Sequence, residues 1–487
     1  MLGCIIAIFL IIISACSRLL FGTPIKSNPS MNKQEFTGGK ETSILILPTQ
    51  LVNIDFLNNL GVKHVYLCAL DYYYGRLRFH KLKLALLRAT MLKYQEELEA
   101  AGFKTTLVDS IKVTDLCVDP IDDVPRKMVM DAGIKIVDSP NFILTHEEAK
   151  QAPAPHDKFY VYQRNKLNIL QNGDKPIGDK YSFDVENRKK FNNIENVKKA
   201  DQEIKDLAKT NNESKALACK WVNEKYPNAR CTADPENFVF PVDRKEANDA
   251  LELAMTHLPN FGEFQDAVHP DIAFGYHSIL SSSLNVGLLT PMQVVNRAIK
   301  EWKDKKVSLV SVEAFIRQII GWREYVRSVY IKDANAHRAA NYFGGKEKIP
   351  ESWYNATTGI SLVDSILKRV EKYAYAHHIE RLMYLCAVLN MMGCEPNQIH
   401  DWFMEMVAID AYDWVMVPNI TMGTYRIGGM TKRPYFSSYT YVHNMSGENN
   451  ENDRKIWNEL YYNFLRKHEA LHRNNYFTAR QLRLIKK

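Results

Sequence analysis

Signals for buried β-strands are confined to one part of this 487-residue chain, and that division constrains the fold more than any other feature. Short apolar runs occur at residues 43–48, 62–68, 104–108 and 134–137, and a helical pattern occupies residues 82–98 between the second and third runs. Strands that alternate with helices predict a doubly wound parallel sheet.

From residue 244 to the end, apolar residues recur at helical spacing and no convincing strand pattern is present. The expected fold class is therefore α/β plus all-α. We predict a leader at residues 1–40, an α/β domain at residues 41–155, a connector at residues 156–245 and a large helical domain at residues 246–487.

The composition is that of a soluble globular protein, with 46% hydrophobic and 24% charged residues. The net charge of +7 permits a local basic patch for a phosphate backbone but does not require one. The eight cysteines include no Cys-x-x-Cys and no grouping with histidine at zinc spacing. They are typical of reduced thiols, and we expect an intracellular protein of the cytoplasm, nucleoid or nucleus.

The first 22 residues have an apolar run at residues 5–13. The run is shorter than the roughly 20 residues of a comfortable membrane span, and no basic residue precedes it. Three interpretations remain open: a short signal anchor, a signal peptide, or an extension upstream of a working start at Met31. We favour the last, because nothing after it looks secreted, although membrane association through residues 1–22 stays open.

The stretch from residue 373 to 441 carries the most informative polar residues. His378 and Arg381 are three residues apart, so they share a helix face. That helix is otherwise apolar, with Ile379, Leu382, Met383, Cys386 and Leu389 at helical spacing. A polar pair there needs a buried partner or a ligand, because unpaired burial is costly.

The motifs of this stretch occur together and in order. They read Tyr-Ala-His-His-Ile-x-Arg-Leu-Met from Tyr375, Trp-Phe from Trp402, Asp-Ala-Tyr-Asp-Trp-Val from Asp410 and Pro-Asn from Pro418. The chain resembles the prokaryotic (6-4) photolyase-like branch of the photolyase/cryptochrome family, from about residue 44 to residue 465. This resemblance implies an antenna-type α/β domain, a helical domain that binds FAD, and UV-damaged DNA as the partner of a monomer.

A Ser-rich turn at residues 277–291 resembles the family's flavin loop, Ser-x-Leu-Ser-Pro-x-Leu-x-x-Gly. Hydroxyl groups and loop amides ahead of a helix can donate to a pyrophosphate, although such a turn can equally be a plain helix cap. Ser282 stands where proline is usual. The resemblance implies flavin contacts from Ser278, Leu280, Ser281, Ser282 and Asn285.

A second segment, Gln-Ile-Ile-Gly-Trp-Arg-Glu from Gln318, also matches the family. The resemblance implies that Gln318 and Arg323 contact the flavin and that Trp322 lines the substrate opening. The alternative is a helix with an Arg-Glu surface pair.

The resemblance further implies that Arg381 and Asp410 form a pair against the flavin ring. Asp413 and Asn419 are further candidates near the ring, and which residue faces the flavin N5 stays open. Relatives carry an acid where this chain has Met416.

His377 and His378 are the expected catalytic pair. In relatives that repair (6-4) lesions, a histidine at the position of His378 lies over the lesion, and small shifts place a histidine pKa near the working pH. Enzymes for cyclobutane dimers typically carry asparagine there. The alternative for His378 is a satisfied core histidine.

Electrons that reduce the flavin are expected to pass through aromatic side chains. Trp402 matches a family aromatic, and Tyr354 aligns with the next one, with Phe403 and Trp353 beside them. The alternative is ordinary core packing.

Cations beside an aromatic follow the same stretch and are expected to bind DNA. These candidates are Arg426, Lys432, Arg433 and Tyr435, together with Trp322. The alternative is a solvated Lys-Arg loop.

In the α/β domain, His80, Lys81 and Lys83 resemble the family's antenna segment and can face an antenna chromophore. The alternative is the solvated start of a helix.

Many relatives bind an iron–sulfur cluster through four cysteines. The corresponding positions here fall near Leu362, at residues 447–450 and at residues 455–462, and no cysteine stands there. We therefore predict no iron–sulfur cluster, and expect Trp457, Tyr461 and Tyr462 to pack in that space.

The favoured hypothesis is light-driven DNA repair by electron transfer from reduced FAD, with (6-4) lesions as substrate. The alternatives are a blue-light photoreceptor of cryptochrome type without repair activity, and a relative that binds no flavin.

Overall fold

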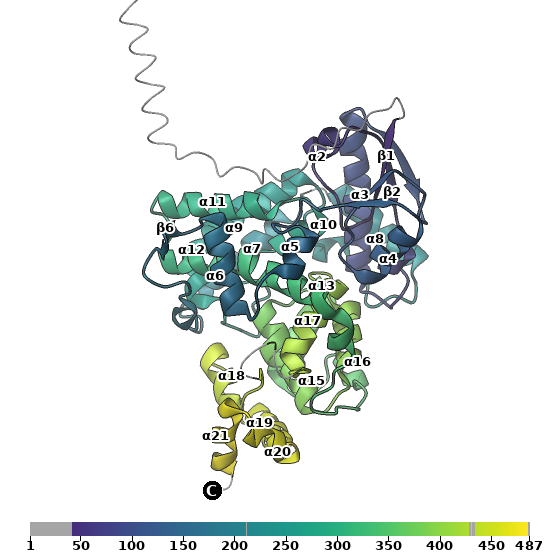
Figure 1. The fold of residues 1–487 in the computed structure, drawn as a ribbon. Helices are drawn as coiled ribbons and strands as arrows, with labels where there is room; N and C mark the ends of the chain where they lie inside the picture. Colours follow the sequence, from purple (N-terminus) through teal and green to yellow (C-terminus); the bar gives the residue numbers. More distant parts are fainter. Residues whose placement is uncertain (1–40, 211, 428–429, 431–433, 486–487) are drawn as a thin grey trace, which may run out of the picture. The chain divides into compact units, whose positions relative to one another are not determined.

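A computed structural model describes residues 41–485 apart from residues 211, 428–429 and 431–433. All elements belong to one compact unit, Thr42–Lys487 (Figure 1). The predictions for residues 1–40 lie outside the described residues.

A five-stranded parallel sheet has the order β3-β2-β1-β4-β5, which confirms the predicted doubly wound fold. The predicted strand at residues 134–137 is β5, and β4, a run of three buried residues, was not predicted because it is too short to show a pattern. The strands are β1 (Thr42–Ile46), β2 (Val62–Cys68), β3 (Lys104–Val108), β4 (Leu116–Val118) and β5 (Lys135–Val137).

We call residues 42–155 the sheet region. Three of its four helices begin at a side-chain cap, for example Asn53, whose side chain accepts from the Phe56 amide at the start of α2. The helices are α2 (Ile54–Asn59), α3 (Lys81–Ala100), α4 (Asp123–Asp131) and α5 (His146–Gln151).

Residues 156–243 form a connector that contains helices and one short hairpin. Its helix α8 packs on α3 of the sheet region, and one continuous apolar core joins the connector to the residues before and after it. The boundaries at residues 155 and 245 stay predictions. The elements are α6 (His156–Leu167), β6 (Gln171–Asn172), β7 (Lys175–Pro176), α7 (Ile194–Leu207) and α8 (Asn212–Lys225).

We call residues 244–485 the helical region, and its described residues contain no strand, as predicted. Two segments, η4 (Arg317–Arg323) and η6 (Glu380–Cys386), are π-helices within longer helices. The α-helices are α9 (Arg244–Phe264), α10 (Leu280–Val286), α11 (Pro291–Lys303), α12 (Leu309–Ile316), α13 (Glu324–Ala339), α14 (Ser361–Tyr373), α15 (Ala387–Met391), α16 (Pro396–Met406), α17 (Asp413–Thr424), α18 (Tyr439–Ser446), α19 (Glu451–Lys467), α20 (Glu469–Arg473) and α21 (Tyr476–Ile485).

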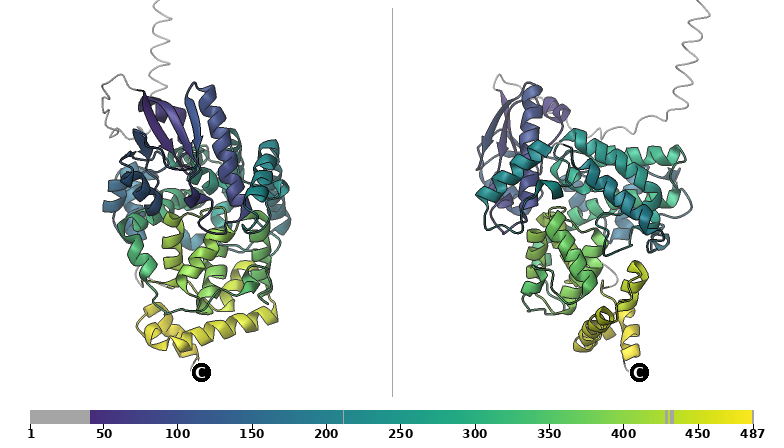
Figure 2. Two further views of the ribbon diagram at one scale, coloured as in Figure 1. Left: turned by 90° about the vertical axis from the view of Figure 1, so that its right-hand side faces the viewer. Right: turned by 180° about the vertical axis from the view of Figure 1, so that it is seen from behind.

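The C-terminal helices α18–α21, yellow in Figure 2, lie together at the end of the helical region that is remote from the sheet. Across the described residues, none of the helices combines the length and the apolar character needed to span a membrane.

Candidate functional site

A cavity with about 1070 Å³ of empty space, part of it open to solvent, lies between five segments of the helical region. Its wall brings together residues that are up to 158 positions apart in the sequence, from Phe261 to Asn419. Of the predicted site residues, those in the wall are Ser278, Leu280, Ser281, Asn285, Gln318, Trp322, Arg323, His377, His378, Arg381, Asp410 and Asn419.

Both π-helices supply residues to this wall. η4 provides Gln318, Trp322 and Arg323, and η6 provides Arg381. A π-turn inserts an extra residue into a helix and is frequent at functional sites. The helical spacing predicted for this stretch is therefore interrupted where its side chains face the cavity.

A chain of hydrogen bonds crosses one side of the cavity. Arg323 Nε donates to Asn285 Oδ1 at 3.2 Å, and Asn285 Nδ2 donates to Asp410 Oδ1 at 2.7 Å. Arg381 donates to Asp410 Oδ2 at 2.9 Å, so the predicted pair is formed. Burial lowers the pKa of Arg323 to about 10, and its guanidinium lies 4.2 Å from the centre of the Phe142 ring.

His378 lines the main cavity, and part of its surface is exposed. Burial within the protein and the charge of Arg381 lower its pKa to about 3, so the imidazole is neutral near pH 7. This shift is larger than the small one expected from the sequence. It follows from the desolvated setting that the tertiary structure creates.

His377 also lines the main cavity and stacks on His277, with ring centres 4.3 Å apart and planes 12° apart. Burial lowers the pKa of both rings, that of His277 to about 3. Sequence reasoning did not select His277 as a site residue, although it heads the Ser-rich turn. Other cavity residues that it missed are the wall aromatics Phe261, Phe315, Tyr375 and Trp414.

Two predicted flavin residues do not line the cavity. The Ser282 hydroxyl is buried and donates to the Ile279 carbonyl of its own helical turn at 2.8 Å. Asp413 turns away and binds Arg76 of the sheet region with both carboxylate oxygens, at 2.7 and 3.2 Å. In both cases a nearer protein partner satisfies the polar atoms.

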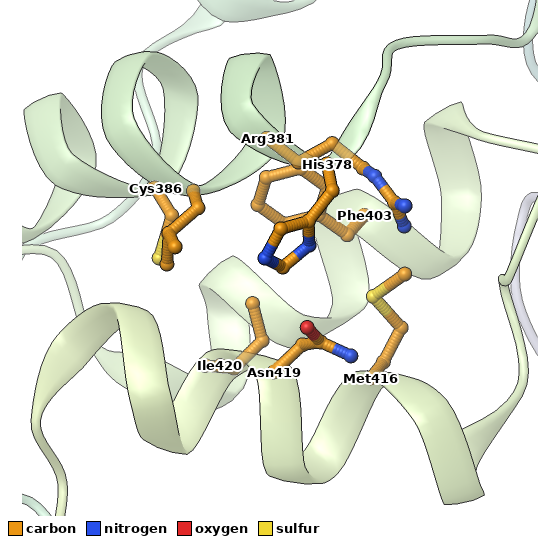
Figure 3. Close-up of a pocket in the computed structure, with 8 residues that line it drawn as sticks. His378, Arg381, Cys386, Phe403, Met416, Asn419 and Ile420 are labelled. Carbon is orange, nitrogen blue, oxygen red and sulfur yellow. The ribbon is translucent and has the colours of Figure 1, made fainter. Parts of the chain in front are cut away.

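A smaller cavity of about 270 Å³ adjoins the main one and shares His378, Arg381 and Asn419 with it (Figure 3). The Asn419 amide lies on α17 opposite the His378 ring, and its Nδ2 donates to the Val415 carbonyl at 2.8 Å. The remaining wall is apolar apart from one thiol, and consists of Leu382, Cys386, Phe403, Met416 and Ile420.

The predicted aromatic relay is partly assembled. Trp353, Trp402 and Phe403 form consecutive edge-to-face contacts, with ring centres 5.8 and 5.0 Å apart, and Phe403 borders the smaller cavity. Tyr354 instead packs against Arg230, whose guanidinium carbon lies 4.0 Å from the centre of the Tyr354 ring.

The predicted DNA contacts have different positions. Trp322 lines the main cavity and stacks on His156 with ring centres 3.7 Å apart. Arg426 is 2% exposed and donates to the carbonyls of Arg338 and Ala340, so it is engaged by the protein itself. Tyr435 is half-buried, and Lys432 and Arg433 lie outside the described residues.

The three predicted antenna residues are buried rather than solvated. His80 contacts the Glu371 carbonyl through Nε2 at 2.9 Å, and Lys83 Nζ donates to the Ala411 carbonyl at 2.7 Å. Lys81 is 9% exposed. His80 and Lys83 therefore join the sheet region to the helical region, because their partners lie on α14 and in the loop before α17.

The positions of the family's cluster cysteines hold other contacts. The Asp453 carboxylate accepts from Ser361 and from the Leu362 amide, and fully buried Trp457 donates to the Ser437 carbonyl at 2.8 Å. Such residues do not fit thiolate ligation. Within the described residues, no three His, Cys, Asp or Glu side chains are grouped to hold a metal ion.

Comparisons with known proteins agree with this arrangement. The family model for deoxyribodipyrimidine photo-lyase-related proteins matches residues 44–117 and 105–238. A (6-4) photolyase of Agrobacterium fabrum is 28% identical over 488 residues, which cover 90% of this chain and 94% of the relative. The uncharacterized protein R853 of Acanthamoeba polyphaga mimivirus is 37% identical over 111 residues, 23% of this chain and 84% of that protein.

Solved structures share the fold. A bacterial class III photolyase from Agrobacterium tumefaciens superposes with a TM-score of 0.55 at 13% identity, over 87% of this chain and 88% of that one. A Synechocystis cryptochrome gives a TM-score of 0.56 at 14% identity, over 84% and 89% of the two chains. In its α/β and helical fold, its motifs and these relatives, the chain is similar to photolyases and cryptochromes.

Proposed function

We propose that this protein is a light-driven DNA-repair flavoprotein that acts on (6-4) photoproducts. The observation that carries the proposal is the main cavity, which gathers twelve of the residues expected from the sequence and has His378 in its wall. Its (6-4) photolyase relative spans nearly the whole chain.

FAD fits this cavity in chemistry. Cofactor sites are mostly apolar with a few placed polar groups. Here Phe261, Phe315 and Ile319 supply apolar surface. Ser278, Ser281 and Gln318 supply polar groups suited to phosphate and ring edges. Reduced FAD, when bound, supplies the electron that light drives onto the lesion.

Arg381 and Asp410 position charge beside the cofactor. Each side chain is largely buried, at 12% and 16% exposure, and each is hydrogen-bonded, which a desolvated ion pair requires. The Asn285 amide fixes the second carboxylate oxygen. The pair therefore presents a fixed cation at the wall that the two cavities share.

His378 handles the proton at the lesion. The neutral imidazole donates one N–H and accepts at the other nitrogen, so it can hydrogen-bond to the lesion without carrying charge. Entry of negatively charged DNA raises the pKa of a nearby histidine and favours the protonated acid. Trp402 and Phe403 connect the cavity to Trp353 for electron supply.

The remaining assignments belong to the same proposal. The protein acts as an intracellular monomer on UV-damaged DNA, with Trp322 at the opening. An antenna chromophore binds in the sheet region through residues other than His80 and Lys83, whose polar atoms have protein partners. No iron–sulfur cluster is bound.

Purified protein illuminated with blue light tests the proposal. We expect FAD absorption, its bleaching on photoreduction, and repair of an oligonucleotide with a defined (6-4) lesion. An identical oligonucleotide with a cyclobutane dimer is the matched control. Photoreduction without repair of either lesion would support a photoreceptor, and a protein that binds no flavin would contradict the proposal.

A further inference from the structure

The loop that precedes α17 is held from two sides by the sheet region. Lys83 on α3 donates from Nζ to the Ala411 carbonyl at 2.7 Å, and Asp122 Oδ1 accepts from the Trp414 amide at 2.8 Å. Both side chains are 2% exposed. The two contacts lie 39 residues apart in the sheet region but only three residues apart on the loop.

Asp122 takes the place of a missing helix cap. Tyr412 is the N-cap residue of α17, yet its side chain accepts no hydrogen bond from the helix. Asp122 is itself the N-cap residue of α4 and makes no cap there. Its carboxylate instead serves the second residue of α17, where a cap side chain normally accepts.

The loop at residues 410–414, which Lys83 and Asp122 contact, contains two cavity residues. Asp410, which pairs with Arg381, lies just before the Lys83 contact, and Trp414, at the Asp122 contact, lines the cavity and packs edge-to-face on Phe142. Asp410 has φ 58, a left-handed conformation that asparagine, aspartate and glycine adopt most readily. The two sheet-region contacts, at residues 411 and 414, follow this turn and hold the backbone directly after it.

We propose that Lys83 and Asp122 are positioning residues that clamp the loop 410–414 and so place Asp410 and Trp414 in the wall of the cavity. The inference rests on the proposed function only where it concerns FAD. Neither residue touches the cavity, and each acts through a backbone group of the loop.

The clamp explains why lysine and aspartate occupy two buried positions. A carbonyl needs a donor and an amide needs an acceptor, so the two ends of the loop require opposite chemistry. The Lys83 amino group lies 3.8 Å from the centre of the Phe79 ring, so this ring packs against it.

Hydrogen exchange tests the clamp without flavin or light. In Asp122→Ala, the amides at the start of α17 should exchange about tenfold faster than in the wild type, because a lost cap opens the first turn. Asp122→Asn keeps an acceptor oxygen and should exchange within about twofold of the wild type. Lys83→Met keeps the length without the donor and should speed exchange around Ala411.

Asn53→Ala is the matched control, because it removes a cap of α2 inside the sheet region. It should leave exchange at α17 unchanged. In the holoprotein, Asp122→Ala and Lys83→Met should each weaken FAD binding about tenfold and alter the circular dichroism of the bound flavin, whereas Asp122→Asn and Asn53→Ala should do neither.

Exchange at α17 that is unchanged in Asp122→Ala and Lys83→Met would overturn the clamp, as would equal acceleration in Asn53→Ala. A wild-type protein that binds no FAD would instead overturn the proposed function, and the exchange experiment would still decide the clamp.

Discussion

Asp410 and Asp413 belong to one short motif but lie in two different environments. Asp410 faces the cavity, where it has one cationic partner, Arg381, and one amide partner, Asn285. Asp413 faces the sheet region, where Arg76 binds it in bidentate fashion. Arg338 and His400 of the helical region approach it within 3.3 and 3.2 Å.

One short segment therefore supplies a cavity residue, Asp410, and an anchor. The anchor is Asp413 together with its partners Arg76, Arg338 and His400. The two carboxylates point in different directions, Asp410 to the cavity and Asp413 to Arg76. The cavity pair leaves room for a ligand, whereas Asp413 is only 3% exposed and is surrounded by the protein's own cations. We therefore expect changes in the cavity to affect binding and repair, and changes in the anchor to affect stability.

The largest expected effect is on repair. His378→Ala should reduce repair of a (6-4) lesion about 10²–10⁴-fold, the typical contribution of a positioned acid–base group, while leaving flavin photoreduction largely intact. Repair of a defined oligonucleotide under blue light measures it. His377→Ala, which removes a ring stacked on His277, should cost less. Unimpaired repair by His378→Ala would remove its catalytic assignment.

The anchor should dominate stability. Asp413→Ala leaves the Arg76 guanidinium without its bidentate partner, and we expect a loss of about 3–5 kcal/mol in the unfolding free energy, as when one partner of a buried ion pair is removed. Urea denaturation measures this loss. The control Asp131→Ala breaks an exposed pair with Lys127 and should cost at most about 1 kcal/mol. Equal losses of unfolding free energy in Asp413→Ala and Asp131→Ala would show that the anchor contributes no more than an exposed ion pair.

Asp410→Asn should affect FAD binding more than stability, the opposite of Asp413→Ala. The amide keeps a hydrogen bond to its neighbours but removes the charge opposite Arg381, so FAD should bind about tenfold more weakly, with little change in stability. Fluorescence titration of FAD checks the affinity. A large loss of stability without loss of FAD binding would show that Asp410 belongs to the anchor instead.

The smallest expected effect is a pH dependence of the anchor. Burial and the neighbouring Asp413 raise the pKa of Asp122 from its ordinary 3.8 to about 7. Geometry agrees, because the Tyr72 hydroxyl lies 3.3 Å from Asp122 and 3.0 Å from Asp413 and has only one proton to donate. The other bond then needs a proton on a carboxyl group, and Asp122 supplies it.

Proton linkage sets the direction in which the unfolding free energy changes with pH. Between about pH 4 and about pH 7 the folded protein keeps a proton that the unfolded chain releases, so the unfolding free energy should fall as the pH rises through this window. Asp122→Asn should lack this component. His400 adds a slope of the same direction, because Asp401 and Asp413 outweigh burial and raise its pKa. The quantity to measure is therefore the difference in unfolding free energy between the wild type and Asp122→Asn as a function of pH. Identical pH profiles of the two proteins would contradict the prediction.

The other groups around the anchor bear on the same titration. Burial favours the uncharged form of Lys83, whereas His400 and Arg76 outweigh burial at Asp413 and hold its pKa well below the usual range. Further charged or titratable groups around the two carboxylates are Tyr73, Asp123, Tyr330, Arg338 and Tyr412.

Local pattern was sufficient for most of the fold and for much of the cavity. Strands β2 and β3 occur at the predicted residues, and β1 and β5 within two residues of them, because runs of apolar and β-branched residues set their own secondary structure. The cavity residues could be predicted because they occur in dense motifs whose resemblance to a family already encodes their proximity.

Tertiary structure alone decided where the remaining polar side chains point. Lys83 and His80 read as the solvated start of a helix or an antenna contact, and Asp413 as a ring contact, but their partners lie about 290 to 340 residues away in the sequence. A local sequence pattern cannot predict a partner that is so distant in the sequence. A buried polar group must be satisfied, and which distant backbone or side chain satisfies it is known only once the chain has folded.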